Sequence, residues 1–98
     1  MKIGHSIFDV RIDFVTFGGD KGKAEFWELK DYEDADSAAE GCILRLLGVT
    51  FVKELVHVDV YNETEKERST PEILSVAQYR AMDKESPKVD IEISFYKG

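Results

Sequence analysis

Hydrophobic and polar residues alternate with a period of two over several separate stretches of the chain. Alternation of this kind predicts β-strands that bury one face and expose the other. We expect strands over residues 6–17, 24–32, 51–62 and 89–96. The first has its apolar face on Phe8, Val10, Ile12 and Phe14. The glycine-rich segment 18–22 predicts a hairpin connection between the first two strands.

Strand parity assigns the remaining side chains to the two faces of the predicted sheet. In the second strand Trp27 and Leu29 share one face, and Phe26 lies on the other with Glu28 and Lys30. The residues expected to face the core in the last two strands are Val52, Val56, Val58, Val60, Val89, Ile91, Ile93 and Phe95. Those expected to face outward in the third strand are Lys53, Leu55, His57, Asp59 and Tyr61.

A helical period replaces the alternation between the second and third strands. The apolar positions with this spacing are Ala39, Cys42, Ile43, Leu46 and Leu47. They predict an amphipathic helix over 37–47 that covers one face of the sheet. Ser37 and Glu40 fit a capping box at its start, and Gly48 fits a left-handed cap at its end.

The segment 62–88 has the weakest pattern in the chain. Residues 62–68 are charged and lack periodicity, which predicts a mobile loop. Ser69, Pro71 and Glu72 are typical of a helix start and predict a second, short helix over 71–82. The pattern leaves open whether 62–88 forms a lid, a loop or part of an interface.

The order of these elements predicts an α+β two-layer sandwich formed by residues 1–98 as a single domain. We expect a four-stranded mixed sheet covered by one main helix, with the short second helix before the last strand. This order is similar to the β-grasp arrangement, in which the first and last strands pair in parallel at the centre of the sheet. An open two-layer sandwich with another strand order is the alternative.

Charge and cysteine content narrow the classes of function. The net charge of −7 disfavours direct binding to nucleic acid or to an anionic membrane. The single cysteine, Cys42, is predicted to be a buried, unreactive thiol on the apolar helix face. The chain has no long apolar run and no signal-peptide pattern, so we expect a cytoplasmic protein.

The residues that carry chemistry do not form a recognisable catalytic motif. His57 and Asp59 share a face, but a metal site needs three or four converging ligands. The other histidine, His5, precedes the first strand. Cys42 is predicted to lie on the opposite side of the sheet from His57, which excludes a nucleophile and base pair. We therefore expect no catalytic residues, no metal, no cofactor and no enzymatic activity.

Two surfaces are candidates for binding a partner. The outward strand positions are rich in carboxylates and tyrosines, and we take as the acidic binding residues Asp9, Asp13, Asp59, Tyr61, Asp90, Glu92 and Tyr96. Phe17 and Phe26, with Val15, form an apolar patch near the hairpin tip. That patch either contacts a partner or packs under the second helix.

These surfaces predict a small acidic protein-binding module whose partner has a basic surface. The chain resembles small anti-defence proteins of phages and mobile elements in size and charge, which implies an inhibitor of a nucleic-acid-handling protein. One alternative is a small enzyme or ligand-binding protein that uses the open sheet face or the segment 62–88. Another is a structural homodimer built on the apolar patch or on a sheet edge.

Overall fold

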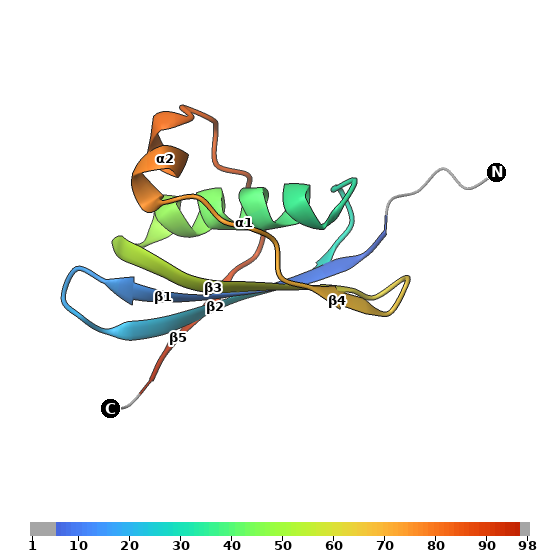
Figure 1. Ribbon diagram of the computed structural model, residues 1–98, viewed down its shortest axis with the longest axis horizontal. Coiled ribbons are helices and arrows are strands. Elements are labelled where there is room, and N and C mark those ends of the chain that lie inside the picture. The colour runs from blue at the N-terminus through green and yellow to red at the C-terminus, as the bar shows by residue number, and fades with distance from the viewer. Residues whose placement is uncertain (1–5, 97–98) are drawn as a thin grey trace.

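Five strands form one twisted sheet, and both helices lie on the same side of it (Figure 1). The computed structural model describes residues 6–96, so His5 lies outside the described part. The elements in chain order are β1 (Phe8–Thr16), β2 (Lys21–Leu29), α1 (Ala35–Val49), β3 (Val52–Asn62), β4 (Glu67–Ser69), α2 (Val76–Ala81) and β5 (Glu92–Phe95). The predicted α+β class, with helices on one face, is confirmed.

The strand order corrects the predicted topology. The sheet has five strands in the order β4-β3-β1-β2-β5, and every neighbouring pair is antiparallel. The four-stranded mixed sheet and the central β1–β5 pairing of a β-grasp are therefore wrong. β2 takes one edge of β1 and β3 takes the other along its whole length, so β1 has no edge left for β5. β5 pairs with β2 at the border of the sheet instead.

The core lies between α1 and the sheet, and its centre agrees with the sequence pattern. Phe8, Val10, Ile12 and Phe14 of β1 are all buried, as predicted. The residues that α1 buries are Ala38, Ala39, Gly41, Cys42, Ile43 and Leu46. Burial raises the pKa of the Cys42 thiol far above its usual range, so Cys42 is a packed, protonated side chain.

A β-bulge reverses the predicted faces of β2 for the residues before Glu28, whereas Leu29 remains on the core side. Phe8 pairs with Leu29 and Val10 pairs with Phe26, so two residues of β2 lie opposite Asp9. One of them, Glu28, has a φ of 56° and its amide donates to Asp9 Oδ1 at 2.9 Å. Phe26 is consequently in the core, and Trp27 is 50% exposed on the other face. The expected outward position of Phe26 is wrong because parity does not hold across a bulge.

Irregular pairing also changes the phase of β3. The register with β1 shifts twice, between Asp13 and Phe14 and between Val15 and Thr16. As a result Leu55 is buried and Val56 is exposed, the reverse of the prediction. Each shift leaves one β3 residue without a partner, which turns the following side chain to the other face.

The α1 helix is longer at both ends than predicted. Asp34, not Ser37, is the N-cap, and its Oδ1 accepts from the Ser37 amide at 2.8 Å. This hydrogen bond lowers the pKa of the Asp34 carboxyl. Glu40 does not close the predicted capping box, because the Ser37 amide donates to Asp34 instead. The Glu40 Oε1 atom accepts from Lys84 Nζ at 2.8 Å. The helix continues through Gly48 and ends at the cap residue Thr50.

The segment after β3 is more ordered than predicted. Residues 62–68 are not a loop throughout, since β4 pairs with the end of β3 and makes a hairpin. The Asn62 side chain accepts from the Glu65 amide at 3.0 Å within the turn. The second helix begins after Ser75, which forms a capping box with Gln78, so the predicted start at Ser69 is wrong. Ser69 belongs to β4.

Candidate functional site

The face of the sheet opposite α1 is the main candidate site, and we call it the open face. The helices of the described chain lie on the other side of the sheet (Figure 1). The side chains that define the open face are Asp9, Arg11, Asp13, Val15, Lys21, Lys23, Glu25, Trp27, Val56, Asp59, Tyr61, Arg68 and Tyr96. Strand pairing therefore brings together residues that are up to 87 positions apart in the chain.

The structure places most of the predicted acidic binding residues on the open face. Asp9, Asp13, Asp59, Tyr61 and Tyr96 lie on it together. Glu92 pairs with Glu25 at the β2–β5 border.

Two predicted residues occupy other positions. Asp90 precedes β5 and is not on a strand, and it lines a hollow with Trp27 and Tyr32 at the end of β2. Phe26 is fully buried and is not accessible to a partner. Phe26 is therefore not a partner-binding residue, because the bulge turns its side chain toward α1.

The open face is not the one-sided acidic surface that parity predicted. The bulge places Lys23 and Glu25 on this face in place of Glu28 and Lys30. Lys23 then lies opposite Asp13, and Arg11 lies between Asp59 and Glu25. Opposite charges in facing positions stabilise a sheet. The face is consequently a mixed-charge surface in which most carboxylates have a cation beside them.

A chain of hydrogen bonds connects β1 with the residue that follows β5 on this face. Arg11 Nη2 donates to Tyr96 Oη at 2.9 Å, and Tyr96 Oη donates to Asp13 Oδ1 at 3.0 Å. Arg11 Nη2 also lies 3.4 Å from Asp13 Oδ1. These bonds hold the residue that follows β5 against β1 and turn the Arg11 guanidinium toward Asp13 and Tyr96.

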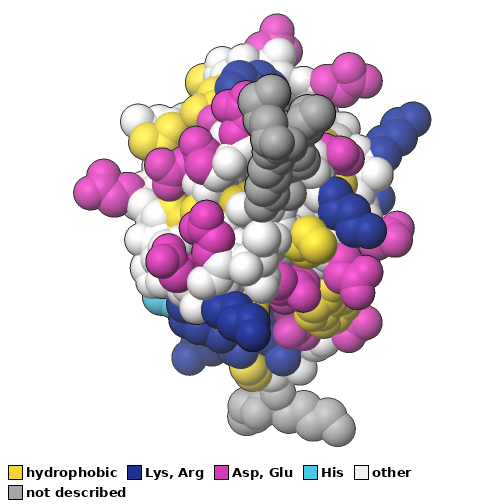
Figure 2. Space-filling model, turned by 90° about the vertical axis from the view of Figure 1, so that its right-hand side faces the viewer, with side chains coloured by type: hydrophobic (Ala, Val, Ile, Leu, Met, Phe, Trp, Pro, Cys, Tyr) yellow, Lys and Arg dark blue, Asp and Glu magenta, His cyan; other side chains and the backbone are white. Residues whose placement is uncertain are grey.

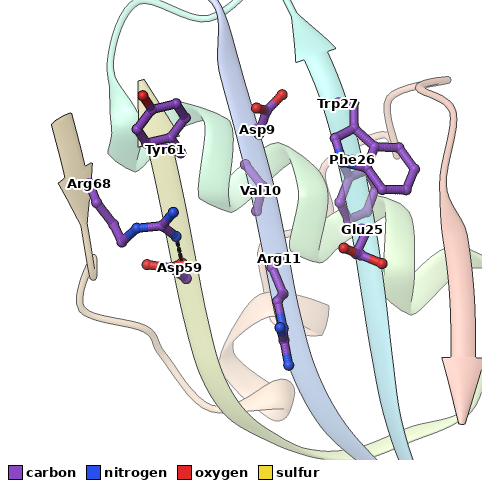
Figure 3. Close-up of a pocket in the computed structure, with 9 residues that line it drawn as sticks. All are labelled: Asp9, Val10, Arg11, Glu25, Phe26, Trp27, Asp59, Tyr61 and Arg68. Atoms are coloured by element: carbon purple, nitrogen blue, oxygen red, sulfur yellow. Dashed lines mark hydrogen bonds and ion pairs between the residues drawn. The ribbon is translucent and has the colours of Figure 1, made fainter. Parts of the chain in front are cut away.

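A shallow hollow of about 260 Å³ lies across β3, β1 and β2 on the open face (Figure 3). Its lining residues are Asp9, Val10, Arg11, Glu25, Phe26, Trp27, Asp59, Tyr61 and Arg68. The Arg68 side chain extends from β4 over the Tyr61 ring, with its guanidinium carbon 5.3 Å from the ring centroid. The same guanidinium forms an ion pair with Asp59.

Carboxylates gather at the end of the molecule where α1 begins and the β3–β4 turn lies (Figure 2). This acidic end consists of Asp9, Glu28, Asp31, Glu33, Asp34, Asp36, Glu63, Glu65 and Glu67, with Lys30, Lys66 and Arg68 as its cations. A hydrogen bond with the Asp9 carboxyl and the charges of Asp9 and Glu28 raise the pKa of Glu63. The acidic end therefore contains mutual repulsion.

The opposite end of the sheet is apolar. Thr16 pairs with Val52, so Phe17 and Phe51 both lie at this end, where they are 67% and 79% exposed. Packing under the second helix, the alternative for Phe17, does not occur. On the adjacent part of the open face a hollow of about 250 Å³ is lined by Val15, Val56 and Tyr96 among others.

Four charged or aromatic residues that line the hollow across β3, β1 and β2 are absent from the predicted binding set, namely Arg11, Glu25, Trp27 and Arg68. Alternation counted from Gly22 to Phe26 predicts that Glu25 faces outward. Alternation counted back from Leu29 through Trp27 predicts that Glu25 faces the core, so the sequence gives two conflicting predictions for this residue. No sequence pattern indicates that Arg68 lies on a strand, because β4 contains no apolar residue.

Among residues 6–96, no group of three or more His, Cys, Asp or Glu side chains is arranged to hold a metal ion. Neither of the helices found in this part of the chain has the length and apolar character needed to cross a membrane. His57 is exposed and lies opposite Asp13, while Cys42 is buried on the core side of α1. No protein family, curated protein or solved structure matches this chain, and the function is therefore inferred from the site itself.

Proposed function

We propose that this protein is a protein-binding module that uses the open face to hold a partner with a basic surface. The observation that carries the proposal is the exposure of large apolar side chains on that face. Trp27, Val56 and Tyr96 are each about half exposed, at 50%, 58% and 49%. Exposed aromatic side chains surrounded by charged ones are typical of protein interfaces, where the aromatic groups supply most of the binding energy.

The charge distribution supports a basic partner. The chain carries a net charge of −7, and the acidic end adjoins the open face through Asp9. A cationic surface placed there would relieve the repulsion among Asp9, Glu28 and Glu63, which adds to the hydrogen bond with Asp9 in raising the pKa of Glu63. Complementary charge also accelerates association, because it acts over about a Debye length before contact.

Inhibition of a nucleic-acid-handling protein is the specific form of this function that we propose. Proteins that bind phosphates present clusters of lysine and arginine. The acidic end offers such clusters a run of carboxylates, and the open face adds aromatic anchors beside it. We place this function in the cytoplasm, in agreement with a single cysteine that is buried and reduced.

Affinity capture from the native host lysate tests the proposal, with elution first by salt and then by duplex DNA. The wild-type protein is compared with Glu65→Lys/Glu67→Lys, which reverses two exposed charges of the acidic end. Glu72→Lys/Glu85→Lys is the matched control, since it changes the net charge equally at two exposed positions outside the acidic end. We expect a basic protein that salt and DNA both release and that the double variant fails to retain. Equal retention by all three proteins, resistant to salt and DNA, would contradict the proposal.

A structural homodimer is the second candidate, and the exposure of Phe17 and Phe51 at the apolar end favours it. A monomer rarely leaves neighbouring aromatic side chains this exposed without a contact to make. Sedimentation over a range of protein concentrations distinguishes the two functions, because the homodimer forms without any other protein.

A further inference from the structure

The two strands on either side of β1 each present a carboxylate and an aromatic side chain to the open face. β3 carries Asp59 and Tyr61, and β2 carries Glu25 and Trp27. Within each pair the carboxylate and the aromatic ring are two residues apart, so they point to the same face. The register aligns the two pairs, because Arg11 of β1 lies opposite both Asp59 and Glu25 (Figure 3).

The β3 pair already binds a guanidinium group. Arg68 places its guanidinium over the Tyr61 ring and forms an ion pair with Asp59. The two contacts act together, since the ring face attracts the cation and the carboxylate accepts its hydrogen bonds. The chain's own arginine thus demonstrates the chemistry of a carboxylate beside an aromatic ring on this sheet.

The β2 pair has the same chemistry but a different set of neighbours. Trp27 is half exposed, and the side chain of Glu25 is 26% exposed. The cation beside Glu25 is Lys23, whose Nζ lies 3.7 Å from Oε1. The Arg11 guanidinium is held by Tyr96 and Asp13. Within residues 6–96, the contact of Arg68 with Tyr61 is the only cation–π contact.

We propose that Glu25 and Trp27 form a docking point for an arginine side chain of the partner protein. This inference deepens the proposed function and rests on it, because it names the group by which a basic partner is held. The hollow of about 260 Å³ that contains both pairs provides the space, and Asp9 adds a carboxylate between them. Arginine is favoured over lysine, because a planar guanidinium stacks on an aromatic ring while it pairs with a carboxylate.

Trp27 is the only tryptophan of the chain, so its fluorescence reports directly on this site. The probe is a blocked peptide containing two adjacent arginines, and the comparison peptide contains two lysines. We expect a saturable change in fluorescence with the arginine peptide and weaker binding of the lysine peptide. Equal affinity for the two peptides, or no saturable change with either, would overturn the proposal.

Substitutions of Glu25 and Trp27 test whether these two residues bind the arginine peptide. By calorimetry, Glu25→Gln and Trp27→Ala should each weaken arginine-peptide binding about three- to thirtyfold, as expected for one lost charge or cation–π contact. Glu85→Gln removes the same charge at an exposed position outside the hollow and should leave the affinity unchanged. Circular dichroism establishes that each variant is folded. Unchanged affinity of Glu25→Gln would overturn the proposal.

Removal of the Arg68 side chain should strengthen peptide binding, whereas the two preceding variants should weaken it. Arg68→Ala frees the Asp59 and Tyr61 pair, so the arginine peptide gains a second docking point. We expect tighter binding, whereas a purely structural role for the hollow predicts weaker binding or none. A loss of affinity in folded Arg68→Ala would contradict the equivalence of the two pairs.

The same variants separate this inference from the proposed function. In one outcome the peptides fail to bind, but Glu25→Gln and Trp27→Ala still retain a basic protein that salt releases. The docking-point proposal is then wrong and the proposed function stands. If the arginine peptide binds through Glu25 and Trp27 but the lysate yields no basic partner, the proposed function is wrong and the docking point stands.

Discussion

Gly22 is required where it stands because the Phe14 ring lies directly over its α-carbon. A β-carbon at this position would lie 2.5 Å from Phe14 Cζ, and Phe14 is buried and packs edge-on against Phe95. Gly22→Ala should therefore lower the free energy of unfolding by about 1–3 kcal/mol, as overpacking of a core does. Urea unfolding measures this loss.

Gly18→Ala is the control for that prediction, since the nearest atom to its β-carbon would be 3.7 Å away. Gly18 lies in the connection between β1 and β2, where an added methyl group meets no ring. Equal unfolding midpoints for Gly22→Ala and the wild type would show that the Phe14 ring moves aside freely.

Glu63 is expected to make stability depend on pH in a direction opposite to that of most carboxylates. Contact with Asp9 raises the pKa of Glu63 above its ordinary value of 4.5, so the folded state binds the proton more tightly than the unfolded state. The contribution of Glu63 to stability is therefore greatest below pH 4.5 and is lost as the pH rises through the raised pKa. Glu63→Gln should be more stable than the wild type at neutral pH.

Thermal unfolding of both proteins between pH 4 and pH 7 checks this expectation. The difference in Tm should grow as the pH rises, because the wild type acquires the repulsion among Glu63, Asp9 and Glu28 and the variant does not. A constant difference in Tm over the whole range would mean that Glu63 does not titrate against these neighbours.

At the scale of elements, α1 supplies the cover for the sheet. Leu46 is fully buried near the C-terminal end of α1, in the same core as Ile12 and Val58. Leu46→Ala should lower the free energy of unfolding by about 2–5 kcal/mol, as for other buried leucines. Denaturant unfolding measures it, and a loss below about 0.5 kcal/mol would mean that α1 does not hold the core together.

The short β4 strand changes the expected dynamics of the segment after β3. The sequence pattern predicts that residues 62–69 have the least protected amides, whereas the structure pairs Glu67, Arg68 and Ser69 with β3. Amides in the β3–β4 ladder should therefore exchange more slowly than those of residues 83–91, which form no regular element. Hydrogen exchange followed by NMR tests this order, and the reverse order would show that β4 is not stably paired.

At the scale of the whole molecule, charge and apolar surface lie at opposite ends. Carboxylates gather near the β3–β4 turn, and Phe17 and Phe51 lie at the far end of β1 and β3. If two copies associate through the apolar end, Phe51→Ser should shift sedimentation toward the monomer by at least about tenfold in Kd, since a buried phenylalanine contributes about 1.5–3 kcal/mol. A wild-type protein that stays monomeric at millimolar concentration would exclude this contact.

The sequence by itself determined the features that depend on local pattern. β1 alternates without interruption, so its buried face was predicted residue by residue, and Cys42 was placed correctly on the buried side of a helix. The α+β class follows from the change of period between strands and helix. Part of the candidate site was also predictable, because Asp9 and Asp13 belong to the regular β1 and face away from its core side.

The tertiary structure alone decided the faces of β2 before Glu28, the faces of Leu55 and Val56 in β3, the existence of β4 and the position of β5. Val52, Val58 and Val60 of β3 are buried as the alternation predicted. The bulge at Glu28 and the two shifts in β3 occur where these strands pair with β1, and a single extra residue inverts the parity of the positions that follow it. Trp27, Glu25 and Arg68 therefore meet on one surface only after the strands pair. Pairing between distant strands depends on which edges are free, and no local pattern of hydrophobic residues contains that information.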